Sequence, residues 1–392
     1  MSQVIKKYIN IIKREISRIS KDKNIFMMII IVPVFYSFFY GSLYYYKTEK
    51  DVLICVVDMD KSEFSRNFIQ RLDANELTKV DVVLTNLTEA KELLEKMEVH
   101  GIIFIPPDSE SDLKSNKGIT IKAYLNTTRF LVSNDINKSV NQTAFSFGDD
   151  SKKILFQKSG FSSRASEEMI EPLKVENKPL FNTLETYGDF LIPGLIVLII
   201  HQTLMIGMSE SMSKEREENT LKELKRISGG SALLTLAGKG TFYFLLYSAY
   251  SFFIFTVIFS VFKIRFEGDY AALSVLTMLL ILSAIFFCIL VSSFFKRKII
   301  SLQVLAFSSY PIFLISGYIF PFQSLPAGIK IIATALPTTP YFKAFIRLTQ
   351  MNAGMPDVYP ELVHLFMIAV VLGVLAFARL KMVYKPFRNQ EL

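Results

Sequence analysis

Residues 212–236 read MSKEREENTLKELKRISGGSALLTL, a densely charged segment between two apolar runs. The runs at 190–208 and 241–262 are each apolar enough to cross a bilayer, which takes about 20 residues. A charged helix held between two spans has little to bury against its own chain. We therefore expect a soluble partner to bind this segment from outside the membrane.

Composition places the chain among polytopic helical membrane proteins. The 392 residues are 51% hydrophobic, with 35 Phe and 17 Tyr, and their mean hydropathy is +0.34. The net charge of +8 falls in short pieces beside apolar runs, which is the pattern that orients membrane proteins, and not in one patch for nucleic acid. Cys55 is expected in a strand and Cys288 in a span, which argues against a disulfide framework.

The N-terminal residues 1–24 are expected to form a basic amphipathic helix. Isoleucines recur at three- to four-residue spacing, at Ile5, Ile9, Ile12, Ile16 and Ile19. Such a helix suits the membrane interface, and its abrupt junction with a first span at 25–46 favours that placement over an ordinary surface helix. Basic residues precede this span and do not follow it, so we expect a cytoplasmic N-terminus and an uncleaved signal-anchor.

Residues 47–186 change character and predict an inserted extracytoplasmic domain. Short hydrophobic runs at 52–57, 80–84, 101–105 and 119–125 read as strands, and the segments at 62–72, 88–96 and 133–162 read as helices. Strands alternating with helices predict an α/β or α+β domain with a partly parallel sheet. About 140 residues are enough to bury a core of their own.

The remaining chain, 187–380, predicts the other spans. They are expected at 187–208, 240–262, 270–295, 299–320 and 362–380, which with 25–46 gives six. Both termini, the segment 209–239, the loop 296–298 and the tail 381–392 then lie in the cytoplasm, where basic residues belong. Prolines interrupt 321–360, whose short helices are either re-entrant or interfacial on the outer surface. The expected fold is thus a six-span helical membrane protein with an α/β domain inserted after the first span.

No energy source is visible in the sequence. Gly238 and Lys239 resemble the end of a phosphate-binding loop, but that loop needs Gly at 233 and Ser or Thr at 240, where Leu233 and Gly240 stand. The histidines have no metal-ligand spacing, and no span carries the acidic rows of an ion-coupled carrier. His201 lies inside a span, where it either lines a cavity or bonds to a neighbouring helix. The chain is therefore expected to depend on an external motor.

The charged segment is the expected contact for that motor. Its candidate contact residues are Glu215, Arg216, Glu217, Thr220, Leu221 and Leu224. The two leucines would form an apolar ridge that anchors in a groove of the partner, and the charges would set the register. The alternative is a solvated connecting helix whose charges pair among themselves.

Motifs along nearly the whole chain resemble the membrane subunits of type-2 ABC exporters with a large extracytoplasmic domain. They are VLICVVDMDKSEFS at 52–65, VHGIIFIPP at 99–107, FLIPGL at 190–195, KEREENTLKEL at 214–224, SGYIFPFQSLP at 316–326 and LPTTPY at 336–341. Their order and spacing are more specific than any one motif. The family usually has Gly before the Thr of the fourth motif, where this chain has Asn219.

The resemblance implies a bacterial inner-membrane exporter permease with no ATPase site, and ATP and magnesium bound by a separate ATPase subunit. Two permeases, identical or sibling, would pair above two ATPases, and residues 47–186 would offer a site for a periplasmic adaptor. Helices around Pro193, Gly194, His201 and Gly317 would line the path of a drug, a lipid or a similar amphiphile. The alternatives are a membrane receptor or scaffold that binds a partner through its extracytoplasmic domain, and a secondary carrier.

Overall fold

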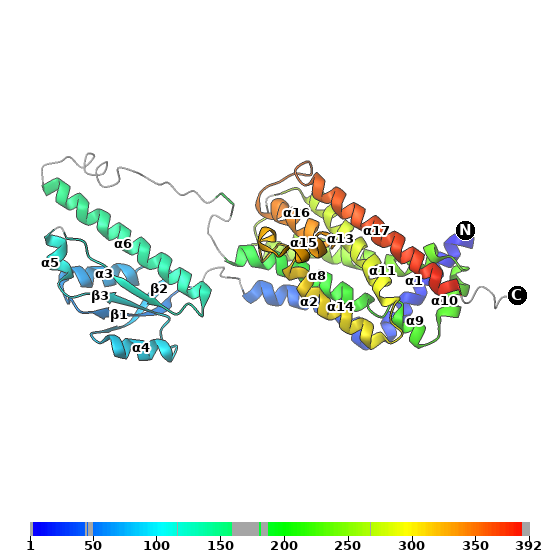
Figure 1. Cartoon of the computed structure of the whole chain (residues 1–392), viewed down its shortest axis with the longest axis horizontal. Helices are drawn as coiled ribbons and strands as arrows, with labels where there is room; N and C mark the ends of the chain where they lie inside the picture. Colours follow the sequence, from blue (N-terminus) through cyan, green and yellow to red (C-terminus); the bar gives the residue numbers. More distant parts are fainter. Residues whose placement is uncertain are drawn as a thin grey trace. The chain divides into compact units, whose positions relative to one another are not determined.

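The computed structural model describes residues 3–43, 45, 50–115, 117–158, 180–181, 187–266 and 268–385. The chain divides into two compact units (Figure 1). One is a helical unit of Met1–Tyr45 with Leu180–Leu392, and the other is a smaller unit of Tyr46–Pro179. The part of the expected tail beyond residue 385 lies outside the described residues.

The smaller unit is built on a mixed sheet in the order β2-β1-β3-β4. Its strands are β1 (Val52–Asp58), β2 (Thr78–Leu84), β3 (Gly101–Ile105) and β4 (Lys122–Leu125). The central strand β1 runs parallel to β2 and β3, whereas β4 pairs antiparallel with β3. The four expected strands are present, and the last begins at Lys122 instead of residue 119.

Two apolar layers cover the sheet because alternate residues of a strand point to opposite faces. Ile54 and Val56 of β1 join one core, whereas Cys55 and Val57 join the other. The helices are α3 (Glu63–Asp73), α4 (Leu87–Glu95), α5 (Ser109–Lys114) and α6 (Phe130–Lys158). Ser62 and Asn86 cap α3 and α4 by accepting backbone N–H bonds, so the turn residues after β1 and β2 start these helices.

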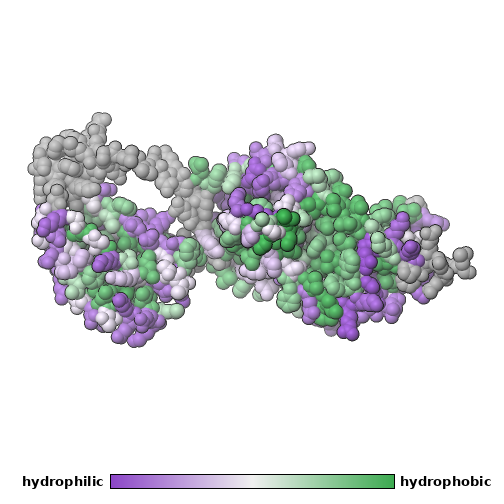
Figure 2. Space-filling view, in the orientation of Figure 1, coloured by the Kyte–Doolittle hydropathy of each residue, from purple (hydrophilic) through white to green (hydrophobic). Residues whose placement is uncertain are grey.

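The helical unit contains five helices that are long and apolar enough to cross a membrane, among the residues that the structure describes. They are α2 (Lys23–Leu43), α8 (Tyr187–Met208) with its continuation to Glu217, α11 (Ala232–Phe253) with its continuation to Val261, α13 (Tyr270–Ser292) and α17 (Tyr359–Tyr384). The continuation of α11 passes through η1 (Ile254–Ile258) and α12 (Phe259–Val261). Figure 2 shows hydrophobic surface over the middle of this unit.

The expected span at 299–320 is a shorter helix, α14 (Lys298–Leu314). Its 17 residues measure about 26 Å at 1.5 Å per residue, less than the roughly 30 Å of a hydrocarbon core. The chain turns after Leu314 and passes through Gly317, whose φ is +92°. The predicted boundary at residue 320 was wrong because this turn ends the helix.

Helix α13 lies at the centre of the helical unit and packs against α17, α11, α8 and α16. The segment 321–360 contains η2 (Phe322–Ser324), α15 (Ala327–Thr334) and α16 (Thr338–Gln350). Tyr341, Phe342 and Phe345 of α16 are buried in the core of the unit. The helices α1 (Gln3–Lys21), α9 (Ser213–Glu217) and α10 (Leu221–Ser228) lie together at one end, here called the α1 end.

Candidate functional site

The charged segment folds as two short helices joined by a tight turn. Helix α9 follows α8 after a turn at 209–212, and α10 follows α9 after Asn219 and Thr220. Asn219 has a φ of +56°, in the left-handed region that Asn tolerates better than most residues with a side chain. This backbone explains why a residue other than glycine is accommodated before Thr220.

Glu215 occupies the centre of a buried charge network. Its side chain is fully buried, and its two carboxylate oxygens accept hydrogen bonds from Arg14 at 2.6 and 3.0 Å. Arg18 forms a second ion pair with it at 2.6 Å, and the Thr220 hydroxyl also donates to it. Two arginines of α1 thus hold one carboxylate of α9.

Lys239 of α11 completes this network from the other side. Its ammonium donates to Glu15 at 2.9 Å, to Glu215 at 3.1 Å and to the carbonyl of Ser211 at 2.9 Å. The Lys239 side chain is 1% exposed and that of Glu15 is 6% exposed. Removing one partner of such a buried pair costs about 3–5 kcal/mol because the other charge remains uncompensated. The network therefore joins α1, α9 and α11 firmly.

Close packing places α1 against α11. Ile11 lies so near Gly238 that a Cβ on this glycine would be 2.7 Å from Ile11 Cγ2, which is shorter than a normal contact. Tyr8 and Thr241 also share a hydrogen bond of 2.6 Å. The buried residues of α1 are Ile11, Glu15 and Ile19, whereas Ile5 and Ile16 of the predicted apolar stripe are exposed.

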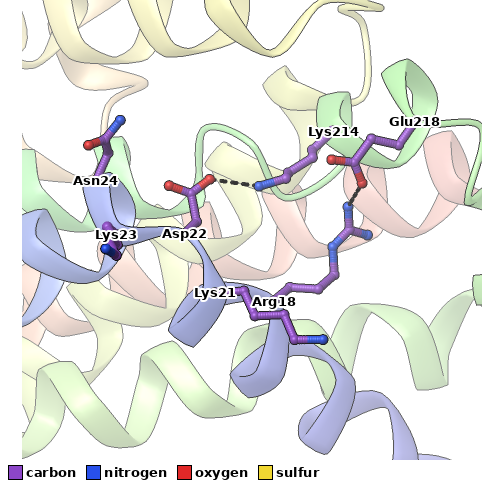
Figure 3. Close-up of a pocket in the computed structure, with 7 residues that line it drawn as sticks. All are labelled: Arg18, Lys21, Asp22, Lys23, Asn24, Lys214 and Glu218. Carbon is purple, nitrogen blue, oxygen red and sulfur yellow. Dashed lines mark hydrogen bonds and ion pairs between the residues drawn. The ribbon is translucent and has the colours of Figure 1, made fainter.

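A charged cleft of about 380 Å³ lies beside the network, where α1 meets α2 (Figure 3). Within it Lys214 pairs with Asp22 at 2.7 Å, and Arg18 pairs with Glu218. Burial by itself raises the pKa of the Asp22 carboxyl, but hydrogen bonds from Lys214 and the Ile25 N–H outweigh it and lower this pKa. Asp22 is therefore held as a carboxylate at the junction of α1 and α2.

The expected apolar ridge does not face outward. Leu221 and Leu224 are 8% and 0% exposed, because the hydrophobic face of α10 packs inside the helical unit. The two leucines therefore do not form the outward ridge that the sequence predicts, and the contact of this segment with an ATPase stays a prediction. The charged segment also has its own chain to bury against, since α1 supplies the groups that surround Glu215.

Of the other expected contact residues, some contact the rest of the helical unit and others are exposed on its surface. Arg216 turns to the end of α13, where it donates to the Ser293 carbonyl at 2.7 Å. The Glu217 side chain is exposed and accepts the N–H of Lys298 at 2.6 Å. The remaining outward side chains are those of Glu218, Asn219, Lys222, Glu223 and Arg226.

The residues expected along a substrate path lie on two elements, namely α8 and the turn that follows α14. Pro193, Gly194 and His201 are buried in α8. A Cβ on Gly194 would be 2.0 Å from the ring of Tyr318, which follows Gly317 directly. The Tyr318 ring stacks on Phe190, and its hydroxyl donates to the Phe190 carbonyl. Gly194 and Gly317 therefore meet through Tyr318, and His201 lies about two turns further along α8.

Sequence reasoning missed Arg14, Glu15, Arg18, Lys239 and Tyr318. Lys239 was considered only as part of a nucleotide loop, although a lysine within an apolar run already signals a buried partner. Glu15 gave a similar signal as an acid in an otherwise basic helix. Its partner lies 224 residues away in the sequence, so the pairing itself could not be read from spacing.

The fold and the network define a class of protein. It is a multi-span helical membrane protein in which the charged segment between α8 and α11 is bound to the N-terminal helix α1. The chain belongs to the ABC-2 transporter family, since the family model described as "ABC-2 family transporter protein" matches residues 23–378. It is similar to the protein named "Probable multidrug ABC transporter permease YbhS" of Escherichia coli strain K12, with 21% identity over 94% of each chain. The protein of that name from Escherichia coli O157:H7 has the same identity and coverage.

Proposed function

We propose that this chain is the permease subunit of an ATP-driven exporter and works with a separate ATPase that binds ATP and magnesium. The observation that carries the proposal is the buried network of Glu215 with Arg14, Arg18 and Lys239. The network binds the charged segment, which connects α8 to α11, to helix α1. A force applied to that segment therefore reaches all three helices together.

The α1 end of the helical unit is assigned to the cytoplasm in this proposal. Basic residues of α1, of 214–226, of 296–298 and of 381–385 all belong to it, and such clusters mark the cytoplasmic side of bacterial membrane proteins. Helix α14 and the turn that follows it then cross the membrane together as the sixth span. The unit of residues 46–179 accordingly lies outside the cytoplasm, where it offers a surface for an adaptor.

The ATPase would contact the outward residues of α9 and α10 and not the buried leucines. Lys222 and Arg226 lie four residues apart on the exposed side of α10, and Glu218 and Asn219 lie on the adjoining turn. Movement of the ATPase during its cycle would shift α9 and α10 as one body with α1. Because Lys239 belongs to α11 and α9 follows α8, both membrane helices would tilt together.

The proposed cargo is hydrophobic or amphiphilic, in keeping with the word "multidrug" in the name of the E. coli relatives. The contact of α8 with Tyr318 is the proposed point where the path opens, since Gly194 allows the ring to lie directly on the helix. Two copies of the chain, or this chain and a sibling, would enclose the path.

Site-specific cross-linking tests the proposal. Both native cysteines are buried, so a photoreactive maleimide can be attached selectively at Lys222→Cys in native membranes. The expected product is a cross-link to a protein with nucleotide-binding motifs, identified by mass spectrometry. Lys79→Cys, on the exposed side of β2, is the matched control and should give no such product. Capture of the ATPase only from Lys79→Cys would contradict the assignment of the coupling surface.

A further inference from the structure

Two arginines converge on one carbonyl at the α1 end of the helical unit. Arg216 donates to the Ser293 carbonyl at 2.7 Å, and Arg379 of α17 donates to the same oxygen at 3.2 Å. Arg379 also reaches the Ser293 hydroxyl at 3.3 Å. Because both guanidinium groups bond to one atom, the two positive charges are close neighbours.

Neither guanidinium forms an ion pair with a carboxylate among the described residues, in contrast to Arg14 and Arg18. A backbone carbonyl carries only a partial negative charge and does not neutralise two cations. The same turn adds Lys296, Arg297 and Lys298, and the nearby Glu217 carboxylate already accepts the N–H of Lys298. The Glu217 carboxylate offsets only part of the charge of these five basic residues, so the cluster keeps an excess of positive charge.

Exposed apolar side chains surround the cluster. The Arg379 guanidinium lies over the Phe294 ring at 4.4 Å, and that ring is 58% exposed. Ile299 and Ile300, at the start of α14, are also exposed. Cations above exposed apolar groups at the end of membrane helices match the boundary between lipid headgroups and acyl chains.

We propose that Arg216 and Arg379 form a binding site for the phosphate of an anionic phospholipid. Guanidinium groups bind phosphate oxygens with paired N–H donors, and Lys296, Arg297 and Lys298 add long-range attraction. The acyl chains lie along Phe294, Ile299 and Ile300. The site joins the ends of α9, α13 and α17, so a bound lipid stabilises their contact. This inference is independent of the proposed function.

A phospholipid fits better than an acidic segment of a protein partner. The exposed Phe294 ring lies directly against Arg379, and α13 and α17 are membrane helices, which places the site at the lipid surface. Free phosphate would use the same donors but gains nothing from Phe294 or Ile299.

Native mass spectrometry of the delipidated full chain tests the site. The protein is titrated with phosphatidylglycerol, with phosphatidylcholine of the same acyl chains, and with inorganic phosphate. We expect phosphatidylglycerol to bind at least about tenfold more tightly than the other two, since each basic residue at a membrane surface contributes about a factor of five to anionic lipid binding. Equal binding of the two lipids, or displacement of the lipid by phosphate at similar concentration, would overturn the proposal.

Matched variants locate the site. R216Q with R379Q should lose this preference, whereas K21Q with K23Q removes the same charge from the nearby charged cleft and should keep most of it. R216K with R379K retains the charges and should retain part of the preference. Hydrogen exchange of the unmodified chain gives a reading that needs no variant: phosphatidylglycerol should protect residues 293–300. An equal loss in both glutamine pairs, or no protection, would contradict the assignment.

Discussion

Replacing Lys239 by methionine removes one cation from the buried network and leaves the Glu15 carboxylate without its partner. The Lys239 ammonium is 2.9 Å from Glu15, and both side chains are almost fully buried. The expected loss is about 3–5 kcal/mol, since the remaining charge keeps its desolvation cost but loses its compensation. Glu215 suffers less, because Arg14 and Arg18 still hold it.

The double variant E15M with K239M separates this explanation from simple loss of packing. Both charges are then absent, so most of the stability should return, as it does when a buried ion pair is replaced by apolar residues. The assay is thermal unfolding of the detergent-purified protein, where the single variant should lower the midpoint on the order of 10 °C. Limited proteolysis of α1 reports release of this helix directly. A double variant no more stable than K239M would refute the reasoning.

Three further predictions concern separate features. Gly194→Ala should destabilise by about 1–3 kcal/mol, because the new methyl group must displace the Tyr318 ring; an unchanged unfolding midpoint would contradict the contact. The pKa of Asp22 is lowered in the folded state, so its contribution to folding stability should be complete above about pH 5 and vanish as the pH falls through that pKa. The difference in unfolding midpoint between the unmodified chain and Asp22→Asn should therefore shrink as the pH is lowered. A difference that does not change with pH would contradict this role of Asp22. Burial raises the pKa of the Cys55 thiol to about 11, and Cys288 is equally buried, so maleimide at pH 7 should label both only after unfolding in detergent; labelling of the folded protein would show that one is accessible.

The sequence was most informative where a pattern is local. Runs of apolar residues located α2, α8, α11, α13 and α17, and short hydrophobic runs between turns located the strands of the smaller unit. Both signals depend on neighbouring residues, so they need no knowledge of tertiary contacts. The end of α14 was missed because the turn at Gly317 lies inside a mostly apolar run that continues to Phe320 without a charged residue.

The candidate site was harder to predict because its charges pair across the chain. An amphipathic helix shows which residues avoid water, but it does not show whether they meet lipid, a partner or another helix of the same protein. Leu221 and Leu224 therefore looked like a docking ridge although they are buried internally. The grouping of Arg14, Glu215 and Lys239 depends on how α1 folds back onto α11, which no local pattern encodes.

The most direct test of the proposed function is purification of the intact protein from its native membranes in mild detergent, with an assay of ATP hydrolysis on whatever accompanies it. We predict a stoichiometric ATPase whose activity falls when the permease is dissociated from it. A preparation without ATP hydrolysis, but with a different partner held by residues 47–186, would contradict the permease account and support a receptor or scaffold.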